Sequence, residues 1–362
     1  MTDLEYMKIA LELAQRGCGW VAPNPMVGAV IVKKGNIIGK GWHRKYGELH
    51  AEREALADCT ESPKGATLYV TLEPCCHHGK TPPCTTAIIE SGIQRVVIAT
   101  LDPNPLVGGK GRDILSLHGI QVTLGVLEQD CRRVNEIFFH YIQSYRPYVV
   151  MKYAMTADGK IATCTGESKW ITGTAARENV QQERHRCSAI MVGVGTVLSD
   201  DPMLTCRLEQ GKQPIRIICD TNLRTPLESR LVKTAAQYRT ILATAVTDQN
   251  RQEQYRYAGC EIIELSQKGA HIDLELLMQR LGRMQIDSIL LEGGGTLNWS
   301  ALESKIVNKV QCYIAPKLFG GRTAVTPVMG QGVNIPEEAF RLIHTRVIKV
   351  GEDILIEGEV EA

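Results

Sequence analysis

The chain has 362 residues, which is enough for two domains that each bury a core of their own. Its 41 basic and 40 acidic residues leave a net charge of +1, which excludes a strong general attraction to nucleic acid or to an anionic membrane. The longest nearly apolar run, residues 189–198, falls well short of the roughly 20 residues that a membrane-spanning helix needs.

The first residues lack the basic and apolar regions of a secretion signal. We therefore expect a soluble, cytoplasmic protein in a reducing compartment. Under those conditions clustered cysteines favour a metal site over disulfides, and the scattered ones are expected to be small core residues.

Helix and strand patterns alternate through the first 144 residues, which is typical of an α/β layer with helices on both faces of a sheet. The chain opens with a predicted helix at 3–16, for which Asp3 is the candidate N-cap. A hairpin with its turn at residues 34–36 follows. Further helices are predicted at 50–59, 84–90, 112–118 and 128–144, and further strands at 67–72, 95–100 and 121–126.

A domain boundary is predicted at about residue 145, because Pro147 breaks the long helix and strand composition begins again at 148–152. The predicted domains are residues 1–145 and residues 146–362. The second continues the α/β pattern, with helices predicted at 174–185 and 274–284, and strands at 189–194, 215–219, 240–245, 288–292 and 309–315.

A candidate zinc site lies between His50 and Cys84. Catalytic zinc needs three ligands, one open position for water, and a proton carrier that is not itself a ligand. His50, Cys75 and Cys84 supply the ligands, and Glu52 supplies the carrier. The pattern matches the H-x-E and P-C-x-x-C signature of zinc deaminases, except that the second half is stretched by a longer insert between its cysteines.

A structural zinc is the competing interpretation, because Cys76, His77 or His78 could close the fourth position. Cys76 is more readily a bystander, since adjacent side chains point apart. His77 and His78 either contact a substrate or face solvent, and Lys80 is either a phosphate ligand or a surface lysine.

The candidate residues suit a deamination. Zinc lowers the pKa of its bound water to about 7 in catalytic sites of this kind. Glu52 can then take a proton from that water and return it to a ring nitrogen and to the leaving amine. Attack at an amidine-like ring carbon would release ammonia and leave a carbonyl.

The second half carries a signal for phosphate binding. A strand runs through Glu292 into residues 293–295, three glycines ahead of a helix, and such a turn leaves backbone amides free for a phosphate. Residues 193–196 form half a dinucleotide fingerprint but lack its third glycine, which disfavours a Rossmann domain. Four arginines either bind phosphate or face solvent: Arg184, Arg186, Arg207 and Arg224.

The whole chain resembles the bifunctional riboflavin-biosynthesis deaminase/reductase family. The resemblance rests on motifs that run in family order: NPMVG at 24–28, HAE at 50–52, TLEPC at 71–75, GKTPPC at 79–84, DPNP at 102–105, DGKIA at 158–162, SKWI at 168–171, VGVGT at 192–196, DDPMLT at 200–205 and EGG at 292–294. It implies an α/β protein with an N-terminal cytidine-deaminase-like αβα layer domain and a C-terminal dihydrofolate-reductase-like domain. The longer insert between the cysteines is a feature of this family.

The resemblance implies two consecutive reactions with Zn²⁺ and NADPH as cofactors. The deaminase would remove the 2-amino group of 2,5-diamino-6-ribosylamino-4(3H)-pyrimidinone 5′-phosphate. The reductase would pass a hydride from NADPH to C1′ of the ribosyl group and open it to a ribityl chain, which gives 5-amino-6-ribitylamino-uracil 5′-phosphate.

The resemblance also implies site residues. The zinc ligands would be His50, Cys75 and Cys84, with Glu52 as the proton shuttle. Candidate substrate contacts in the deaminase are Asn24, His43 and Lys80, and those in the reductase are Ser168, Arg184, Leu204, Arg207 and Glu292. NADPH would be held by Ala154, Trp170, Thr196, Asp200, Thr221, Gly294, Gly295, Thr296, Leu297, Asn298, Trp299 and Ser300. For the proton donor of the reduction, Lys152 and Asp200 are only candidates.

Two rival functions fit the sequence less well. A nucleic-acid deaminase would need a basic stripe with aromatic residues, which the balanced charge and the four phenylalanines argue against. A zinc-stabilised, NADPH-sensing binding protein would leave the carboxylate of Glu52 without a use. We expect a small phosphorylated pyrimidine as the partner, a homo-oligomer, and no nucleic acid or membrane.

Overall fold

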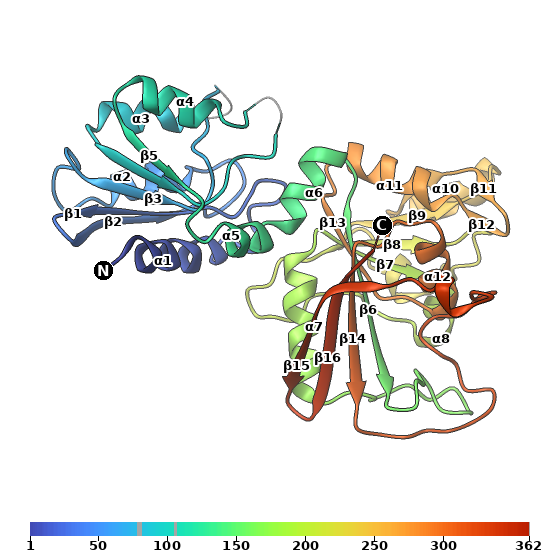
Figure 1. Cartoon of the computed structure of the whole chain (residues 1–362). Coiled ribbons are helices and arrows are strands. Elements are labelled where there is room, and N and C mark those ends of the chain that lie inside the picture. Colours follow the sequence, from blue (N-terminus) through green and yellow to red (C-terminus); the bar gives the residue numbers. More distant parts are fainter. Residues whose placement is uncertain (78–81, 105–106, 362) are drawn as a thin grey trace. The chain divides into compact units, whose positions relative to one another are not determined.

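Two sheets organise the chain, one in each of two units that divide between Tyr145 and Arg146. The structure is a computed structural model that describes residues 1–77, 82–104 and 107–361 (Figure 1). Within these ranges no helix is both long enough and apolar enough to cross a membrane.

The first unit contains a five-stranded sheet in the order β2-β1-β3-β4-β5. Its strands are β1 (Gly28–Lys33), β2 (Asn36–Trp42), β3 (Thr67–Val70), β4 (Arg95–Ile98) and β5 (Gln121–Leu124). Strand β1 pairs antiparallel with β2 and β3, whereas β3, β4 and β5 are parallel. The carboxyl ends of β3 and β4 therefore meet at one edge, where parallel sheets place their ligand sites.

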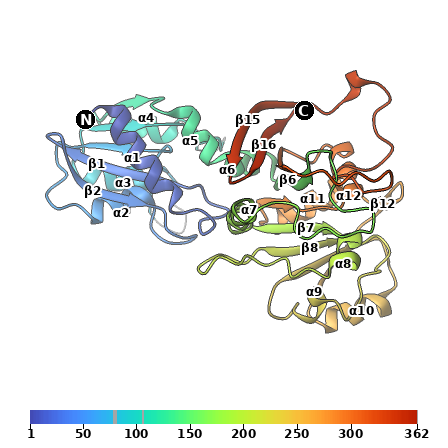
Figure 2. The ribbon, with the colours of Figure 1, turned by 90° about the horizontal axis from the view of Figure 1, so that it is seen from below.

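Helices cover both faces of this sheet, which gives the αβα layers that the sequence predicts (Figures 1 and 2). One layer contains α2 (Ala51–Ala57), α3 (Cys84–Glu90) and α4 (Lys110–Leu117), and the other contains α1 (Asp3–Gln15) and α5 (Glu128–Val134). Along β1, Ala29 and Ile31 face the first layer, and Val30 and Val32 face the second, as the two-residue period of a strand requires.

The N-cap of α1 differs from the prediction. Thr2, rather than Asp3, caps the helix, because its hydroxyl accepts from the Glu5 backbone while the Glu5 carboxylate accepts from the Thr2 backbone. Asp3 serves tertiary structure instead: it forms a 2.6 Å ion pair with Arg95 and accepts a hydrogen bond from the Tyr69 hydroxyl.

The single helix predicted at 128–144 was also wrong. Two helices occupy this stretch, α5 and α6 (Glu136–Ser144), and they divide at Asn135. The Asn135 side chain accepts from the Met26 backbone N–H and donates to the Met26 carbonyl, each at 2.8 Å. This contact with a loop 109 residues earlier in the chain is stronger than the local preference for a continuous helix.

The second unit contains a nine-stranded sheet in the order β10-β9-β8-β7-β13-β6-β14-β16-β15. The strands are β6 (Tyr148–Thr156), β7 (Ala189–Gly193), β8 (Ile215–Cys219), β9 (Thr240–Thr244), β10 (Glu261–Glu264), β13 (Ser288–Leu291), β14 (Lys309–Ala315), β15 (Leu342–Val350) and β16 (Asp353–Val360). In the sheet order, all the strands from β10 through to β14 run parallel to one another. Strand β16 then pairs antiparallel with β14, and β15 pairs antiparallel with β16.

Helices pack on both faces of the large sheet. One face carries α11 (Leu274–Arg283) and α12 (Gly295–Glu303), and the other carries α8 (Val194–Asp200), α9 (Arg230–Lys233) and α10 (Gln249–Tyr257). The remaining elements are α7 (Thr174–Arg186), the short hairpin β11 (Gln267–Lys268) with β12 (His271–Ile272), and a 3₁₀ turn at Pro336–Glu338. The strands predicted between 148 and 315 are present to within a few residues. The elements without a counterpart in the prediction are α8, α9, α10, β10, β11, β12, β15, β16 and the 3₁₀ turn.

We predict that Asn135→Ala destabilises the first unit by about 1–3 kcal/mol, because it leaves two polar groups of the Met26 backbone without partners. The midpoint of urea unfolding, followed in the Met1–Tyr145 unit, measures the effect. Gln143→Ala, an exposed substitution on α6, is the matched control. Equal midpoints for the two variants would contradict the role of Asn135.

Candidate functional site

His50 is held at the start of a helix that packs unusually close to the sheet. It is the N-cap residue of α2 and so lies just ahead of the first helical turn. Gly41 on β2 makes the close approach possible, since a Cβ there would lie 2.3 Å from the Ala55 nitrogen. The packing of α2 on β2 therefore fixes the position of the imidazole.

Two cysteines approach His50 from the carboxyl edge of the sheet. Cys75 follows β3 in a loop, and Cys84 is the first residue of α3. The Cys84 backbone N–H donates to the Cys75 sulfur at 3.3 Å. Two helix N-termini thus converge on the cluster and favour negative charge on it.

The three candidate ligand atoms have the spacing of a tetrahedral metal site. His50 Nδ1 lies 3.5 Å from Cys75 Sγ and 3.4 Å from Cys84 Sγ, and all three atoms lie within 4.8 Å of one another. Zn–N bonds of about 2.0 Å and Zn–S bonds of about 2.3 Å at tetrahedral angles would separate ligand atoms by roughly 3.5 Å. One imidazole and two sulfurs therefore fit zinc in both chemistry and spacing.

The cluster favours a thiolate. The hydrogen bond from the Cys84 thiol lowers the pKa of Cys75, and the His50 imidazole adds to the effect. The hydrogen bond with Cys75 raises the pKa of His50 in turn. Since thiolates are the form that binds zinc, the cluster is prepared for a cation.

Glu52 lies beside the cluster and is almost completely buried, with 3% of its surface exposed. Burial, followed by the negative charge of Cys75, raises the pKa of Glu52 to about 7. A carboxyl group with that pKa exchanges protons readily near neutral pH.

Two of the neighbours that could close the fourth zinc position, Cys76 and His77, lie outside the cluster. Cys76 does not join the three ligand residues, and burial raises the pKa of its thiol. His77 is likewise outside the cluster. His78 and Lys80 lie outside the described residues, so their predicted roles stay predictions.

Asn24 and His43 form a hydrogen-bonded pair next to His50. Asn24 Nδ2 and His43 Nε2 are 3.1 Å apart, and His43 Nδ1 lies 3.0 Å from the Leu49 carbonyl oxygen. Burial lowers the pKa of His43, and a carbonyl only accepts, so the neutral ring carries its hydrogen on Nδ1. Both ring nitrogens of His43 are therefore engaged within the protein.

Glu73 is a buried residue whose role the sequence did not reveal. Its carboxylate accepts hydrogen bonds from the backbone N–H groups of Asp102, Gly109 and Arg112 at 3.1, 2.9 and 3.0 Å. It thereby ties the start of α4 and the loop before it to the strand end that carries Cys75. The only sequence signal was its place immediately before Pro74-Cys75.

In the second unit, Arg184 and Glu292 form a buried ion pair. Arg184 Nε and Nη2 donate to the two carboxylate oxygens of Glu292 at 2.7 and 2.8 Å. Burial by itself would raise the pKa of Glu292, but the charge and hydrogen bonds of Arg184 outweigh it and hold the pKa at about 2. The two-pronged edge of the Arg184 guanidinium, which could otherwise bind a phosphate, is thus paired with Glu292.

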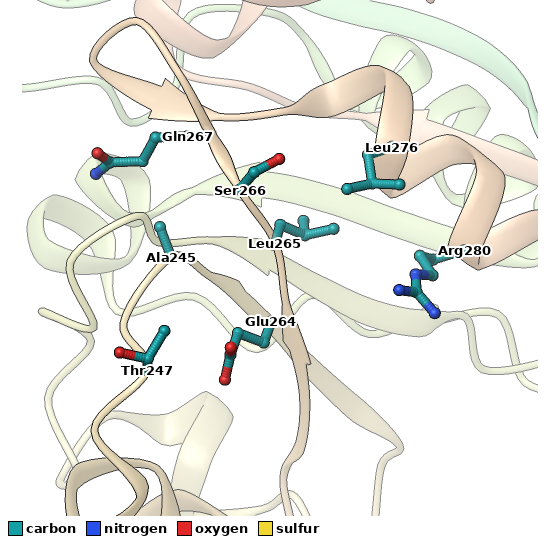
Figure 3. A pocket seen from close by; sticks show the side chains of 8 residues that line it. All are labelled: Ala245, Thr247, Glu264, Leu265, Ser266, Gln267, Leu276 and Arg280. Atoms are coloured by element: carbon teal, nitrogen blue, oxygen red, sulfur yellow. The ribbon is translucent and has the colours of Figure 1, made fainter.

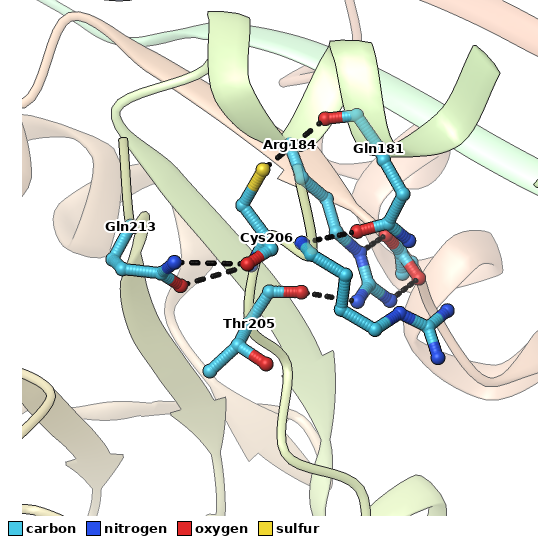
Figure 4. A network of polar contacts seen from close by, with 7 residues as sticks. Gln181, Arg184, Thr205, Cys206 and Gln213 are labelled. Carbon is cyan, nitrogen blue, oxygen red and sulfur yellow. Dashed lines mark hydrogen bonds and ion pairs between the residues drawn. The ribbon is translucent and has the colours of Figure 1, made fainter. Parts of the chain in front are cut away.

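Arg184 also reaches the segment that contains Leu204 and Arg207. Its Nη1 donates to the Thr205 carbonyl oxygen at 2.9 Å, and the neighbouring Gln181 side chain accepts from the Arg207 backbone (Figure 4). The structure therefore brings Arg184 and Glu292 to the segment that contains Arg207, whereas the Leu204 side chain packs in a hydrophobic core. Ser168, the remaining predicted substrate contact of this unit, lies in the loop before α7.

A glycine turn joins the carboxyl ends of β7 and β13. The Gly293 carbonyl accepts from the Gly193 N–H at 3.1 Å and from the Thr196 hydroxyl at 3.3 Å. Gly293 and Gly294 have φ values of +72° and +85°, which side chains other than glycine rarely adopt. The turn opens α12, so its amides and the helix N-terminus fit the phosphates of a dinucleotide.

The side chains that follow the turn have different surroundings. Thr296 is exposed in the first turn of α12. Leu297 packs in the hydrophobic core, Asn298 donates to the Pro327 carbonyl at 2.8 Å, and the Trp299 ring lies 6.0 Å from that of Phe340. The side chains of Leu297, Asn298 and Trp299 therefore make contacts within the protein. Ser300 is half-buried in the same helix.

Thr221 lies just past the carboxyl end of β8, at the same edge of the sheet as the glycine turn. Its hydroxyl accepts from the Ile272 N–H at 3.2 Å, and its carbonyl accepts from the Ala245 N–H at 3.1 Å. Ala245 in turn lines a cavity of about 490 Å³ (Figure 3). It is lined by Ala245, Thr247, Glu264, Leu265, Ser266, Gln267, Leu276 and Arg280.

The other predicted cofactor contacts are more dispersed. Ala154 lies on β6, and Asp200 is exposed at the far end of α8 from Thr196. Trp170 is exposed, with the Arg177 guanidinium 4.7 Å from its ring centroid and the Lys317 ammonium donating to its carbonyl. Lys152, a candidate proton donor, is partly buried on β6, and desolvation lowers the pKa of its ammonium.

Comparison with known families assigns a separate family model to each part of the chain. Residues 1–100 match the cytidine and deoxycytidylate deaminase zinc-binding region. Residues 147–356 match the RibD C-terminal domain, which covers more than half of the chain.

Similar proteins match over nearly the full length. The riboflavin biosynthesis protein RibD of Actinobacillus pleuropneumoniae is 56% identical over 99% of this chain and 95% of its own. That of Escherichia coli is 38% identical over 98% and 99%.

Two solved structures share the architecture. RibD of Acinetobacter baumannii has a TM-score of 0.89 at 36% identity, with 99% of each chain covered. A diaminohydroxyphosphoribosylaminopyrimidine deaminase/5-amino-6-(5-phosphoribosylamino)uracil reductase of Thermotoga maritima has a TM-score of 0.87 at 40% identity, again with 99% of each chain covered. The chain therefore belongs to the RibD family of riboflavin biosynthesis proteins.

Proposed function

We propose that the unit of residues 1–145 is a zinc-dependent pyrimidine deaminase and that the unit of residues 146–362 is an NADPH-dependent reductase. The chain is a bifunctional enzyme of riboflavin biosynthesis, and the similar protein of Thermotoga maritima is likewise named as both a deaminase and a reductase. The two family models support this assignment, because one matches residues 1–100 and the other matches residues 147–356. The deaminase acts on 2,5-diamino-6-ribosylamino-4(3H)-pyrimidinone 5′-phosphate, and the reductase converts the ribosyl group of the product to ribityl.

The deaminase assignment is supported above all by the spacing of His50, Cys75 and Cys84 next to a buried Glu52. In our proposal the three residues hold Zn²⁺ and leave a fourth position for water. Bound zinc supplies a water molecule whose pKa is about 7. A structural zinc with a fourth protein ligand would give Glu52 no role.

Glu52 moves the protons of the deamination. Its pKa of about 7 lets it accept a proton from water and return it within one turnover. Glu52 gives the first proton, taken from the attacking water, to a ring nitrogen of the pyrimidine. It then takes the second from the hydroxyl group newly bonded to the ring carbon and gives it to the departing amine, which leaves as ammonia when the carbon–nitrogen bond breaks. Burial keeps competing water away from the carboxyl group.

Asn24 contacts the pyrimidine in this proposal, and His43 orients Asn24. The Asn24–His43 hydrogen bond holds the Asn24 amide group beside His50. Lys80 is assigned to the substrate phosphate by family resemblance alone, because it lies outside the described residues.

In the reductase, Ser168, Arg184, Leu204, Arg207 and Glu292 form the proposed substrate site. Glu292 neutralises Arg184, so Arg207 supplies the net positive charge for a 5′-phosphate. Lys152 is the better candidate for the proton donor, because it is partly buried close to Glu292, whereas Asp200 is exposed.

NADPH supplies the hydride of the reduction. We assign its phosphates to the glycine turn, with Gly294, Gly295, Thr296 and Thr196 around them. Thr221 extends this edge toward the cavity at Ala245. Ala154, Trp170, Asp200, Leu297, Asn298, Trp299 and Ser300 are proposed contacts by family resemblance. A homo-oligomeric state and a cytoplasmic location stay predictions.

We predict that metal-free protein binds one Co²⁺ per chain and shows sulfur-to-cobalt absorption. His50→Ala, Cys75→Ser and Cys84→Ser should each weaken binding strongly, because a three-ligand site has no ligand to spare. Cys76→Ser is the matched control and should bind as well as the unmodified protein. Loss of Co²⁺ binding in Cys76→Ser with retention in Cys75→Ser would reverse the ligand assignment.

We predict that Glu52→Gln retains zinc and loses ammonia release by about 10²–10⁴-fold, the usual contribution of a general acid–base. The rate of ammonia formation and the zinc content are measured together. Glu54→Gln is the control, because that carboxylate pairs with Arg44 at 3.1 Å at a more exposed position. Near-normal turnover in Glu52→Gln would rule out the proton-carrier role.

Ammonia release should proceed at full rate without NADPH, because the zinc ligands and Glu52 all belong to residues 1–145. NADPH oxidation should begin only once deaminated product is present. With that product supplied, Glu52→Gln should still oxidise NADPH at the unmodified rate. A deamination that requires NADPH, or a deaminated product that is never reduced, would contradict the proposed division of labour.

A further inference from the structure

Residues 203–207 form a segment whose backbone is held by side chains. The segment lies between α8 and β8 and belongs to neither a helix nor a strand. Arg216 donates to the Met203 carbonyl at 3.3 Å, and Arg184 donates to the Thr205 carbonyl at 2.9 Å. Gln213 exchanges two hydrogen bonds with the Cys206 backbone, at 3.0 and 2.8 Å.

One further hydrogen bond of this segment fixes the main chain of Arg207. The Arg207 backbone N–H donates to Gln181 Oε1 at 2.9 Å. The Cys206 thiol points to the main-chain oxygen of the same glutamine, as Figure 4 shows. Gln181 is buried, with 7% of its surface exposed, so water cannot easily replace this acceptor.

Gln181 and Arg184 act from one face of α7, because residues three apart on a helix are neighbours. Arg184 is fixed in turn by its two hydrogen bonds to Glu292. The main chain at Arg207 and the carboxylate of Glu292 are therefore both hydrogen-bonded to side chains of the same helix, α7.

The Arg207 side chain is itself exposed, and no described residue pairs with its guanidinium. Its charge is nevertheless close enough to Glu292 to contribute to the low pKa of that carboxyl group. A fixed main chain with a free guanidinium is the arrangement expected of a residue that waits for an anionic ligand.

We infer that Gln181 is a positioning residue of the reductase: through the Arg207 backbone it holds the Arg207 guanidinium where the 5′-phosphate of the substrate binds, and Gln213 supports the same segment through Cys206. The inference rests on the proposed function, in which Arg207 binds this substrate. Binding should depend on Gln181 only while the Arg207 side chain is present.

The test is a double-mutant cycle with Gln181→Met and Arg207→Ala, in which the KM and kcat of reduction are measured for the phosphorylated substrate. Methionine keeps the length of glutamine without its acceptor oxygen. Gln181→Met should raise KM by about fivefold to tenfold, as expected for one hydrogen bond, and leave kcat within about twofold. In the Arg207→Ala background the same substitution should change KM by less than about twofold.

Gln182→Met is the matched control, since Gln182 is the exposed neighbour on the same helix. It should leave KM unchanged. If Gln181→Met fails to fold, Gln213→Met replaces it, because Gln213 is exposed and its loss removes both contacts with Cys206.

The outcomes separate the inference from the proposed function. An unchanged KM in Arg207→Ala would remove Arg207 from the proposed substrate site, on which the inference rests, and would leave the deaminase and reductase assignments standing. A raised KM in Arg207→Ala, together with an unchanged KM in Gln181→Met, would overturn the positioning role alone. An equal effect of Gln181→Met with and without the Arg207 side chain would likewise overturn it, since the glutamine would then act on the fold in general.

Discussion

A charged group taken out of water must have a partner, and both candidate sites are built around this constraint. In the second unit Glu292 is buried, and Arg184 is its partner. Arg184 also donates through Nη1 to the Thr205 carbonyl oxygen. The ion pair therefore anchors the neighbouring segment as well. In the first unit Glu52 is buried beside thiols and an imidazole, and its environment shifts its pKa toward neutrality instead of pairing it. One carboxylate is thus stabilised as a charge and the other is prepared to exchange a proton.

The sequence predicted the layers and most strands because these depend on local periodicity. It failed where a distant contact decides the local structure. The pattern from 128 to 144 suits one helix, whereas the structure divides it at Asn135, whose side chain is hydrogen-bonded to the Met26 backbone. Strand β15 was missed for another reason: most of its residues are exposed, and its sequence lacks the apolar alternation by which a strand is recognised.

The candidate metal site was predictable because its chemistry requires particular residue types at particular spacings. His50, Cys75 and Cys84 are such residues, and the structure brings their ligand atoms together. The supporting residues were not predictable. Glu73 and Gln181 act by accepting hydrogen bonds from backbone N–H groups far along the chain, and many polar side chains could do so at many positions. Sequence spacing carries no record of such contacts.

The order of strands in the second sheet affects how the chain folds as it is synthesised. Its first strand, β6, is apolar and lies at the centre, between β13 and β14. The sheet of the first unit is complete once β5 has left the ribosome, and a domain folds as a unit as soon as it can. Strand β6, in contrast, has no neighbour to pair with until residues 288–291 have been made, and its second neighbour follows at 309–315. The nascent second unit therefore carries an unpaired apolar strand through most of its own translation.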